Sequence, residues 1–205
     1  FLDATVDLLS RGEWTVREFR AGPLNIYPAV LIAKVLDAFG LWGRGAVLLL
    51  ARLFHAGFLN PLAIWPVFAA ARLLAPPGSQ APRWTAVAFV ASPMVTGTSR
   101  ILYPDHFIIL FAAWFLLELV RVYRDPVATG AYVRLALAWA LGCATKYTAM
   151  FWVAPLGVLV LQRLWTARRE GRLQGEARSL APRGLVFAVV AVVVWSALDF
   201  SALLD

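Results

Sequence analysis

The sequence predicts an all-α membrane protein, a polytopic bundle of about six transmembrane helices. Of its 205 residues, 61% are hydrophobic and only 15% are charged, and the mean hydropathy is +0.72. One soluble core could not bury so much apolar surface, so the bilayer must be part of the solvent. The apolar residues also fall into long runs that arginine-bearing segments separate. Each run near the roughly 20 residues that a bilayer requires is therefore read as a helix.

Charge and motif content exclude several classes of protein. The net charge of +7 comes mostly from arginines between apolar runs, which indicates a membrane surface and makes nucleic acid an improbable partner. The single cysteine, Cys143, excludes an internal disulfide framework and a cysteine-rich metal site. A glycine-rich phosphate loop, a His-x-x-x-His pair and a Gly-x-Ser-x-Gly elbow are all missing, so nucleotide hydrolysis, zinc proteolysis and serine acyl transfer have no support.

The first 40 residues are expected to form an external juxtamembrane segment. Residues 1–20 place apolar side chains between charges, a pattern typical of an amphipathic helix that lies on the membrane. Residues 24–39 hold Lys34 and Asp37 and could be a short span or a second surface helix. Since the chain begins at Phe1 and no signal segment precedes residues 3–20, it is expected to be a piece of a longer protein.

Residues 46–204 are expected to form the transmembrane bundle of a single domain that covers residues 1–205. The first long run, residues 46–74, should cross the membrane from a point close to Arg52, with kinks at Pro61 and Pro66. The proline-rich residues 75–83 should form a loop. Further spans are expected at residues 84–95, 107–122, 131–144, 148–164 and 184–204.

The arginines predict the orientation of these spans. Three connections are rich in arginine and alternate with connections that hold few basic residues. They hold Arg72 and Arg83; Arg121, Arg124 and Arg134; and Arg163, Arg168, Arg169, Arg172, Arg178 and Arg183. These connections should be cytoplasmic, which places residues 1–20, the 98–106 break and the turn at Lys146 on the external face. The same alternation favours a surface helix at residues 24–39.

The break at residues 98–106 is the leading candidate for a functional site, because ionisable groups between apolar runs are costly and commonly functional. Asp105 follows a proline at a helix start, where it could either cap the helix or act chemically. Arg100 and Lys146 could bind a lipid phosphate, or their charged ends could simply reach the interface. His106 could be a proton carrier, a metal ligand or a polar lining residue.

His55 lies inside an apolar run. It is expected to hydrogen-bond to a neighbouring helix.

The order of several short motifs resembles the membrane domain of the GT-C class of polyprenyl-phosphate-sugar-dependent glycosyltransferases. This class includes the protein O-mannosyltransferases and the aminoarabinose transferases that act on lipid A. In chain order the motifs are Leu9, Gly12 and Trp14; Gly22-Pro23-Leu24 before Tyr27-Pro28; Ala51-Arg52-Leu53; Ala71-Arg72-Leu73; Ser92-Pro93; Arg100 with Tyr103-Pro104-Asp105; and Leu141-Gly142-Cys143-Ala144-Thr145-Lys146-Tyr147.

The resemblance implies a function and a set of site residues. A sugar on dolichyl or undecaprenyl phosphate would be the donor, an acceptor hydroxyl would attack its anomeric carbon, and the site would face the periplasm or exterior of a bacterial inner membrane. Asp105 matches the second conserved acidic position of the family, whereas the main catalytic carboxylate is expected upstream of Phe1. The resemblance thus implies that the chain is a fragment that lacks the first transmembrane helix and the C-terminal part of the family. The implied substrate contacts are Arg20, Arg52, Arg100, Tyr103, His106, Lys146 and Tyr147.

The implied partners are the lipid-linked sugar, membrane lipids and an acceptor lipid, glycan or protein. A divalent metal is possible, because some relatives use one and others do not. A different class also fits the sequence, namely a non-catalytic lipid-binding or transport subunit of a membrane complex. The enzyme predicts sugar transfer that depends on Asp105, whereas the binding subunit predicts no transfer from any donor.

Overall fold

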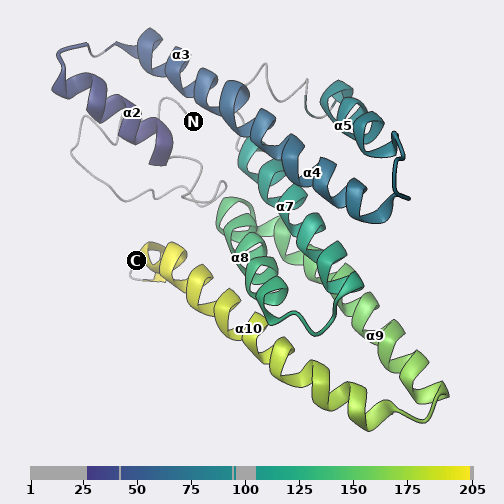
Figure 1. The fold of residues 1–205 in the computed structure, drawn as a ribbon. Helices are drawn as coiled ribbons and strands as arrows, with labels where there is room; N and C mark the ends of the chain where they lie inside the picture. Colours follow the sequence, from purple (N-terminus) through teal and green to yellow (C-terminus); the bar gives the residue numbers. More distant parts are fainter. Residues whose placement is uncertain (1–26, 42, 94, 96–104, 204–205) are drawn as a thin grey trace.

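The computed structural model describes residues 27–41, 43–93, 95 and 105–203, and within them it contains helices and no strand (Figure 1). Among these described residues, four helical stretches are long and apolar enough to cross a membrane: Gly45–Leu74, His106–Arg124, Tyr147–Arg169 and Leu173–Leu198. Large apolar side chains such as Trp65, Phe151 and Leu161 are exposed on these stretches, as expected of surfaces that face lipid. The prediction of an all-α chain with membrane-length helices is confirmed.

Helix α2 (Tyr27–Ala38) is short for a transmembrane helix. Its 12 residues are about 18 Å long, little more than half of a hydrocarbon core. Gly40 ends it with a positive φ of 66°, and the Leu41 amide donates to the Leu36 carbonyl oxygen at 2.8 Å, as in a left-handed helix cap. Between the two alternatives for this region, the length favours a helix on the surface. The predicted amphipathic helix at residues 1–20 lies outside the described residues.

Helix α3 (Arg44–Phe54) continues through a π-helical turn (His55–Leu59) into α4 (Asn60–Leu74). Within the turn the Asn60 amide donates to the His55 carbonyl oxygen, five residues back. Pro61 has no amide hydrogen and would crowd the carbonyl of the preceding turn, so a wider turn just before it is physically reasonable. The helix interruption expected at Pro61 therefore takes the form of a π turn. The helix itself begins at Arg44, upstream of the span start predicted near Arg52.

Helices α4 and α7 (Asp105–Arg124) pack side by side and run parallel. Their contacts follow the same order along both helices. Ala63 and Val67 cluster with Ile109 and Ala113, and one or two turns further on Ala70 clusters with Leu117 and Val120. Both helices therefore begin at one end of the bundle and finish at the other.

Helix α5 (Ala81–Ala91) runs back along α4, where Phe89 packs against the cluster that contains Ala63. It has 11 residues, about 16 Å, and it does not qualify as a membrane-length helix. Ser92 is extended, with ψ 138°, because a residue that precedes a proline disfavours the helical region. The span predicted at residues 84–95 is therefore interrupted at Ser92-Pro93.

Helix α8 (Thr129–Thr145) is the central helix, packed against α7 on one side and α10 (Leu173–Leu203) on the other. Most of its buried side chains are small, which allows neighbouring helices to approach closely. They include Ala131, Ala136, Ala138, Ala140, Gly142 and Ala144. A short connection after α7 makes α8 antiparallel to α7. At 17 residues α8 falls just short of the membrane-length helices.

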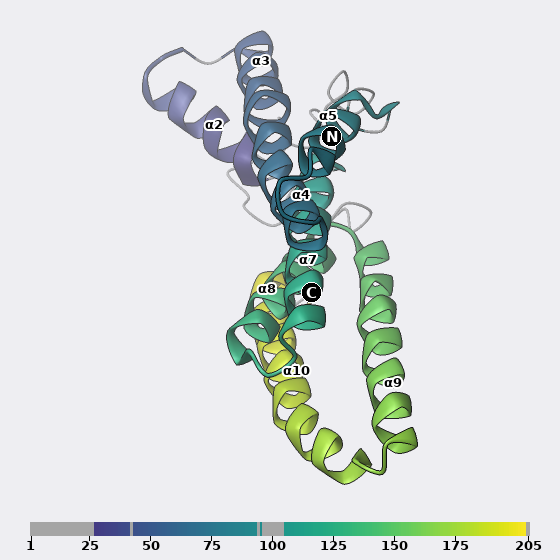
Figure 2. The same ribbon diagram turned by 45° about the vertical axis from the view of Figure 1, so that its right-hand side comes forward.

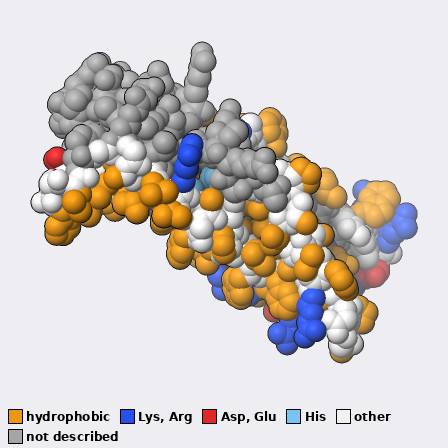
Figure 3. All heavy atoms as spheres, turned by 90° about the horizontal axis from the view of Figure 1, so that it is seen from above, with side chains coloured by type: hydrophobic (Ala, Val, Ile, Leu, Met, Phe, Trp, Pro, Cys, Tyr) orange, Lys and Arg blue, Asp and Glu red, His pale blue; other side chains and the backbone are white. Residues whose placement is uncertain are grey.

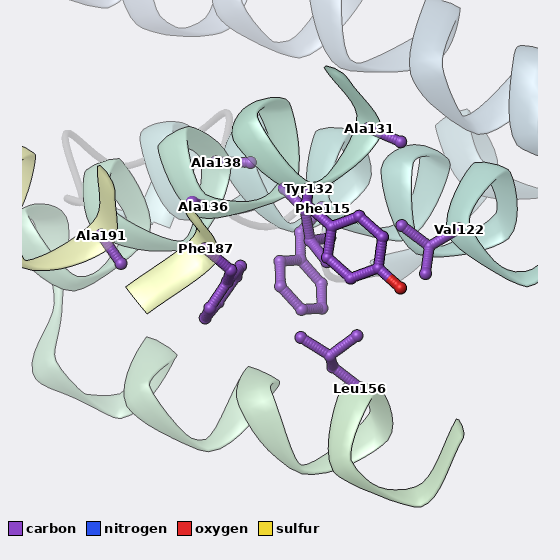
Figure 4. Close-up of a cluster of buried hydrophobic side chains, with 10 residues drawn as sticks. Phe115, Val122, Ala131, Tyr132, Ala136, Ala138, Leu156, Phe187 and Ala191 are labelled. Atoms are coloured by element: carbon purple, nitrogen blue, oxygen red, sulfur yellow. The ribbon is translucent and has the colours of Figure 1, made fainter. Parts of the chain in front are cut away.

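A 3-10 turn (Tyr147–Trp152) leads into α9 (Val153–Arg169), and α10 returns beside α8. The Arg183 Nε donates to the Val127 carbonyl oxygen at 2.9 Å, and the Trp139 and Phe187 ring centroids are 6.0 Å apart, so α10 is parallel to α8. Figure 2 shows α9 standing away from α7 and α8 along much of its length. The main core cluster lies between these helices, and Figure 4 shows its aromatic members.

The helix directions bring the arginine-rich connections to one end of the bundle. The last turns of α4 and α7 hold Arg72, Arg121 and Arg124, and the α9–α10 connection lies beside them. Figure 3 shows basic side chains gathered at this end, whereas hydrophobic side chains cover much of the rest of the visible face. Below, this is called the arginine end, and the end at which α7 begins is called the opposite end.

Candidate functional site

The opposite end of the bundle holds the described residues that the sequence nominated. Asp105 is the first residue of α7, and His106 follows it. Lys146 caps the C-terminus of α8, which is antiparallel to α7, so it too belongs to the opposite end. Arg20, Arg100 and Tyr103 lie outside the described residues, and the structure does not test their predicted roles.

His106 is fully buried between α7 and α4, with 1% of its surface exposed. Its Nδ1 lies 2.9 Å from the Asn60 Oδ1, across the interface of the two helices. An amide oxygen only accepts hydrogen bonds, so in this arrangement His106 Nδ1 carries the proton and donates it. The ring orientation of His106 is thereby fixed by Asn60, a residue that the sequence reading did not single out. Asn60 could have been found as a polar residue inside a membrane-length run.

His55 stacks on His106, with ring centroids 5.6 Å apart and an interplanar angle of 15°. Its other ring neighbours are Phe54 and Phe107. Both of its ring nitrogens are buried and have no hydrogen-bond partner among the residues that the structure describes, so the expected hydrogen bond to a neighbouring helix is wrong for the described helices. His55 is the first residue of the π turn, and its ring contacts His106 and Phe107 of α7.

The turn after α8 places Lys146 and Tyr147. Lys146 is extended, half-buried, and donates its amide to the Gly142 carbonyl oxygen at 2.9 Å. Gly142 is needed for this geometry, because a Cβ there would lie 2.5 Å from the Trp152 ring of the 3-10 turn. Trp152 in turn packs on Phe115 of α7, at 5.9 Å between centroids. Close packing of glycine and tryptophan therefore holds the lysine-bearing turn against α8.

Arg52 does not join this cluster. It lies on α3 one turn before His55, and its side chain is exposed. An exposed arginine beside a membrane-length helix can contact a lipid phosphate from outside, as predicted, or extend to the interface. The structure brings together His55, Asn60 and His106, whereas Arg52 and Lys146 approach the opposite end from different helices.

A buried acid near the arginine end also escaped the sequence reading. Glu118 of α7 has no exposed surface, and it pairs with Arg121 Nη1 at 2.5 Å and with Arg134 Nε of α8 at 3.0 Å. The Arg134 contact is an ion pair without hydrogen-bond alignment, since Glu118 Oε2 receives no hydrogen bond. The signal was present in the sequence, because Glu118 is the one acidic residue in the apolar run 107–122.

The described residues contain no group of three or more histidine, cysteine or acidic side chains arranged to hold a metal ion. The two histidines and Asn60 form a smaller polar cluster, directly after Asp105 in the chain. Within the described residues the His106–Asn60 hydrogen bond and the ring stack fix the position of the imidazoles, so their clear role is to hold the first turn of α7 against α4.

The fold and this site define a helical membrane protein. It has a polar cluster near the opposite end of its bundle and arginine-rich connections at the arginine end. Comparisons with known protein families, with curated proteins and with solved structures found no match for the chain.

The polar cluster predicts opposite outcomes for two substitutions. His55→Phe is expected to raise the free energy of unfolding by about 1 kcal/mol, because it keeps the ring stacking and removes two unsatisfied nitrogens. Asn60→Leu is expected to lower it by about 1–2 kcal/mol, because it leaves the His106 Nδ1 hydrogen without its acceptor. Denaturant unfolding in detergent measures both. A His55→Phe variant as destabilised as Asn60→Leu would show that His55 has a polar partner.

Proposed function

We propose that this chain is the membrane domain of a glycosyltransferase that takes a sugar from a polyprenyl-phosphate donor and gives it to an acceptor hydroxyl. The observation that carries the proposal is the position of Asp105. It is the first residue of α7, at the end of the bundle away from the arginine-rich connections, and it directly precedes His106 of the buried His106–Asn60 pair. This is where the motif order of the sequence predicts the second carboxylate of a sugar-transfer site.

The proposed reaction requires three kinds of group. An acceptor oxygen forms a bond to the anomeric carbon while the bond from that carbon to the lipid phosphate oxygen breaks. The hydroxyl proton passes to a carboxylate, and positive charge must stabilise the phosphate that leaves. Asp105 is proposed as a carboxylate of this site, and Lys146 and Arg100 as the positive charges.

The local structure supports the roles of Asp105 and Lys146. Asp105 lies at a helix N-terminus, where unpaired amides and the helix dipole favour the ionised carboxylate. Asn60 and the stack with His55 hold His106 in place, so the first turn of α7 is anchored against α4. The packing of Trp152 against Gly142 similarly restrains the turn that carries Lys146 and Tyr147. A site with fixed groups loses less free energy when it binds substrate.

The proposal includes a membrane topology. The arginine end would face the cytoplasm of a bacterial inner membrane, and Asp105 would face the periplasm or exterior. Six crossings would require α8 to span between its neighbours and the α5 region to return to the opposite face. Arg52 would then be available on the flank of α3, where a lipid-linked donor could enter from the bilayer.

A donor screen tests the proposal. The full-length protein, reconstituted in liposomes, is incubated with radiolabelled mannosyl, glucosyl and aminoarabinosyl esters of polyprenyl phosphate. With one of these donors, label should leave the lipid-extractable fraction and lipid phosphate should be released. The assay measures the lipid phosphate that is released, so the acceptor need not be known. Water can slowly take the place of the natural acceptor.

If all of the label stayed on the lipid with every donor, the proposed glycosyltransferase activity would be contradicted. Donor binding without any transfer would instead favour the non-catalytic lipid-binding or transport subunit. Equilibrium binding of the same labelled donors separates these two outcomes.

A further inference from the structure

An apolar groove lies between α9 and the pair formed by α8 and α10, far from Asp105. Its cavity volume is about 300 Å³, and its lining is almost wholly hydrophobic. Leu156, Val160 and Leu164 line it from α9, and Tyr132 of α8 and Leu180 of α10 face them. Figure 4 shows Tyr132, Phe115 and Leu156 directed toward the same space between the helices. This cavity is called the α9 groove.

A polar pocket adjoins the α9 groove at the arginine end. It has a volume of about 260 Å³ and is lined by Arg163, Arg172, Thr166 and Glu176, among others. Consecutive residues line the two cavities. On α9, Arg163 lines the pocket and Leu164 lines the groove; on α10, Glu176 lines the pocket and Ala177 lines the groove. The pocket and the groove are therefore neighbours along α9 and α10, with polar residues around one and apolar residues around the other. The polar pocket is called the arginine pocket.

The charge around the arginine pocket favours an anion. Residues 163–183 contain six arginines and two glutamates. Arg163 contacts Glu176 at 3.2 Å and the Tyr123 carbonyl oxygen at 3.4 Å, so it is held at the wall of the pocket. Arg172 pairs with Glu170 and remains 69% exposed. Although Arg163 and Arg172 are each paired with a glutamate, six arginines against two glutamates leave this segment with a net positive charge beside the apolar groove.

We propose that an anionic phospholipid binds here, with its phosphate in the arginine pocket and one acyl chain in the α9 groove. Apolar walls next to a bilayer are filled more favourably by a hydrocarbon chain than by water. Basic pockets between transmembrane helices are established binding sites for anionic lipid head groups, and arginine binds phosphate through paired hydrogen bonds. The lipid covers a flank of α9 that the rest of the bundle leaves uncovered. This inference does not depend on the sugar-transfer proposal.

Two glycines allow a test of the acyl-chain site. A Cβ at Gly184, which lines the α9 groove, would meet no atom within 4 Å, and the same is true of Gly157, which is exposed on α9 outside the groove. Both Gly184→Leu and Gly157→Leu should fold, since leucine is the better helix former. Gly184→Leu fills the groove, whereas Gly157→Leu adds the same atoms elsewhere.

A matched arginine pair tests the head-group site. Arg172 lines the pocket, and Arg178 is an exposed arginine of α10 that does not. Each substitution by glutamine removes one positive charge from the same end of the protein. A difference in lipid binding between the two variants is therefore due to the loss of a pocket residue and not to the change in overall charge.

The experiment measures lipids retained by the delipidated full-length protein with native mass spectrometry. Dioleoyl phosphatidylglycerol, dioleoyl phosphatidylcholine and inorganic phosphate are added separately, and circular dichroism confirms that each variant is folded. Phosphatidylglycerol should bind about fivefold more tightly than phosphatidylcholine, the effect of about one basic contact. Gly184→Leu and Arg172→Gln should each weaken phosphatidylglycerol binding by about fivefold, and Gly157→Leu and Arg178→Gln by less than twofold.

Three results would overturn the proposal. Equal binding of the two lipids would show that the head site does not select an anion. Equal effects of Gly184→Leu and Gly157→Leu would show that the groove holds no acyl chain. Inorganic phosphate that competes fully with phosphatidylglycerol at equal concentration would identify an ion site with no lipid tail.

Discussion

Replacing Asp105 with asparagine is expected to lower sugar transfer by at least about 100-fold while the protein remains folded. Asparagine has nearly the same shape as aspartate, but it is neutral, so the proposed site loses the negative charge of one of its two expected carboxylates. Its short polar side chain is also a favourable residue at a helix start, so α7 should still begin at this position. The measurement is the initial rate of lipid-phosphate release from the donor identified by the screen, together with a thermal unfolding curve.

Asp125→Asn provides the matched control for Asp105→Asn. Asp125 follows the other end of α7, where its Oδ1 accepts a hydrogen bond from the Val127 amide at 3.2 Å. An asparagine keeps that acceptor and removes the same charge at the arginine end, so transfer should remain within about twofold of wild type. Undiminished turnover by Asp105→Asn would remove this carboxylate from the proposed site. An equal loss in both variants would indicate a general effect of charge.

The second large effect concerns stability. Replacing both Arg121 and Arg134 with leucine is expected to lower the free energy of unfolding by about 3 kcal/mol, because Glu118 then remains buried without a counter-charge. Adding Glu118→Leu should restore most of that loss, since replacement of a whole buried ion pair by apolar residues is often neutral. Denaturant unfolding in detergent gives the three free energies.

The matched control for the arginine pair is Arg124→Leu. Arg124 lies in the same last turn of α7, but its side chain is exposed. Its removal should change the free energy of unfolding by less than about 0.5 kcal/mol. If the triple variant remained as unstable as the double variant, the arginines would stabilise α7 and α8 by packing and not by neutralising Glu118.

Local properties of the sequence predicted much of the fold. The runs that contain α4, α7, α9 and α10 are long and apolar, and such runs can satisfy their backbone hydrogen bonds only as helices in a bilayer. Kinks were expected at Pro61 and Pro66; a π turn precedes Pro61, whereas α4 continues through Pro66. The predicted span at residues 84–95 failed at Ser92, where the following proline favours an extended conformation.

The polar pairs could not be predicted in the same way. His106 and Asn60 are 46 residues apart, and they meet only because α4 and α7 are parallel and in one register. His55, which stacks on His106, is also the first residue of a π turn, and the turn is a departure from the regular α-helix. Hydropathy is insensitive to both features, since it records how apolar a segment is and not which neighbour it faces.

The sequence by itself determined that the chain is a helical membrane protein, the positions of its longest helices and the grouping of most of its arginines in the connections between apolar runs. Those properties depend on composition and on near-neighbour spacing. Only the tertiary structure decided which helices are parallel, and hence that His106 is buried against His55 and that Glu118 meets Arg134 of α8. Side-chain packing between distant segments sets these contacts, because each burial is favourable only when the complementary surface of another helix is present.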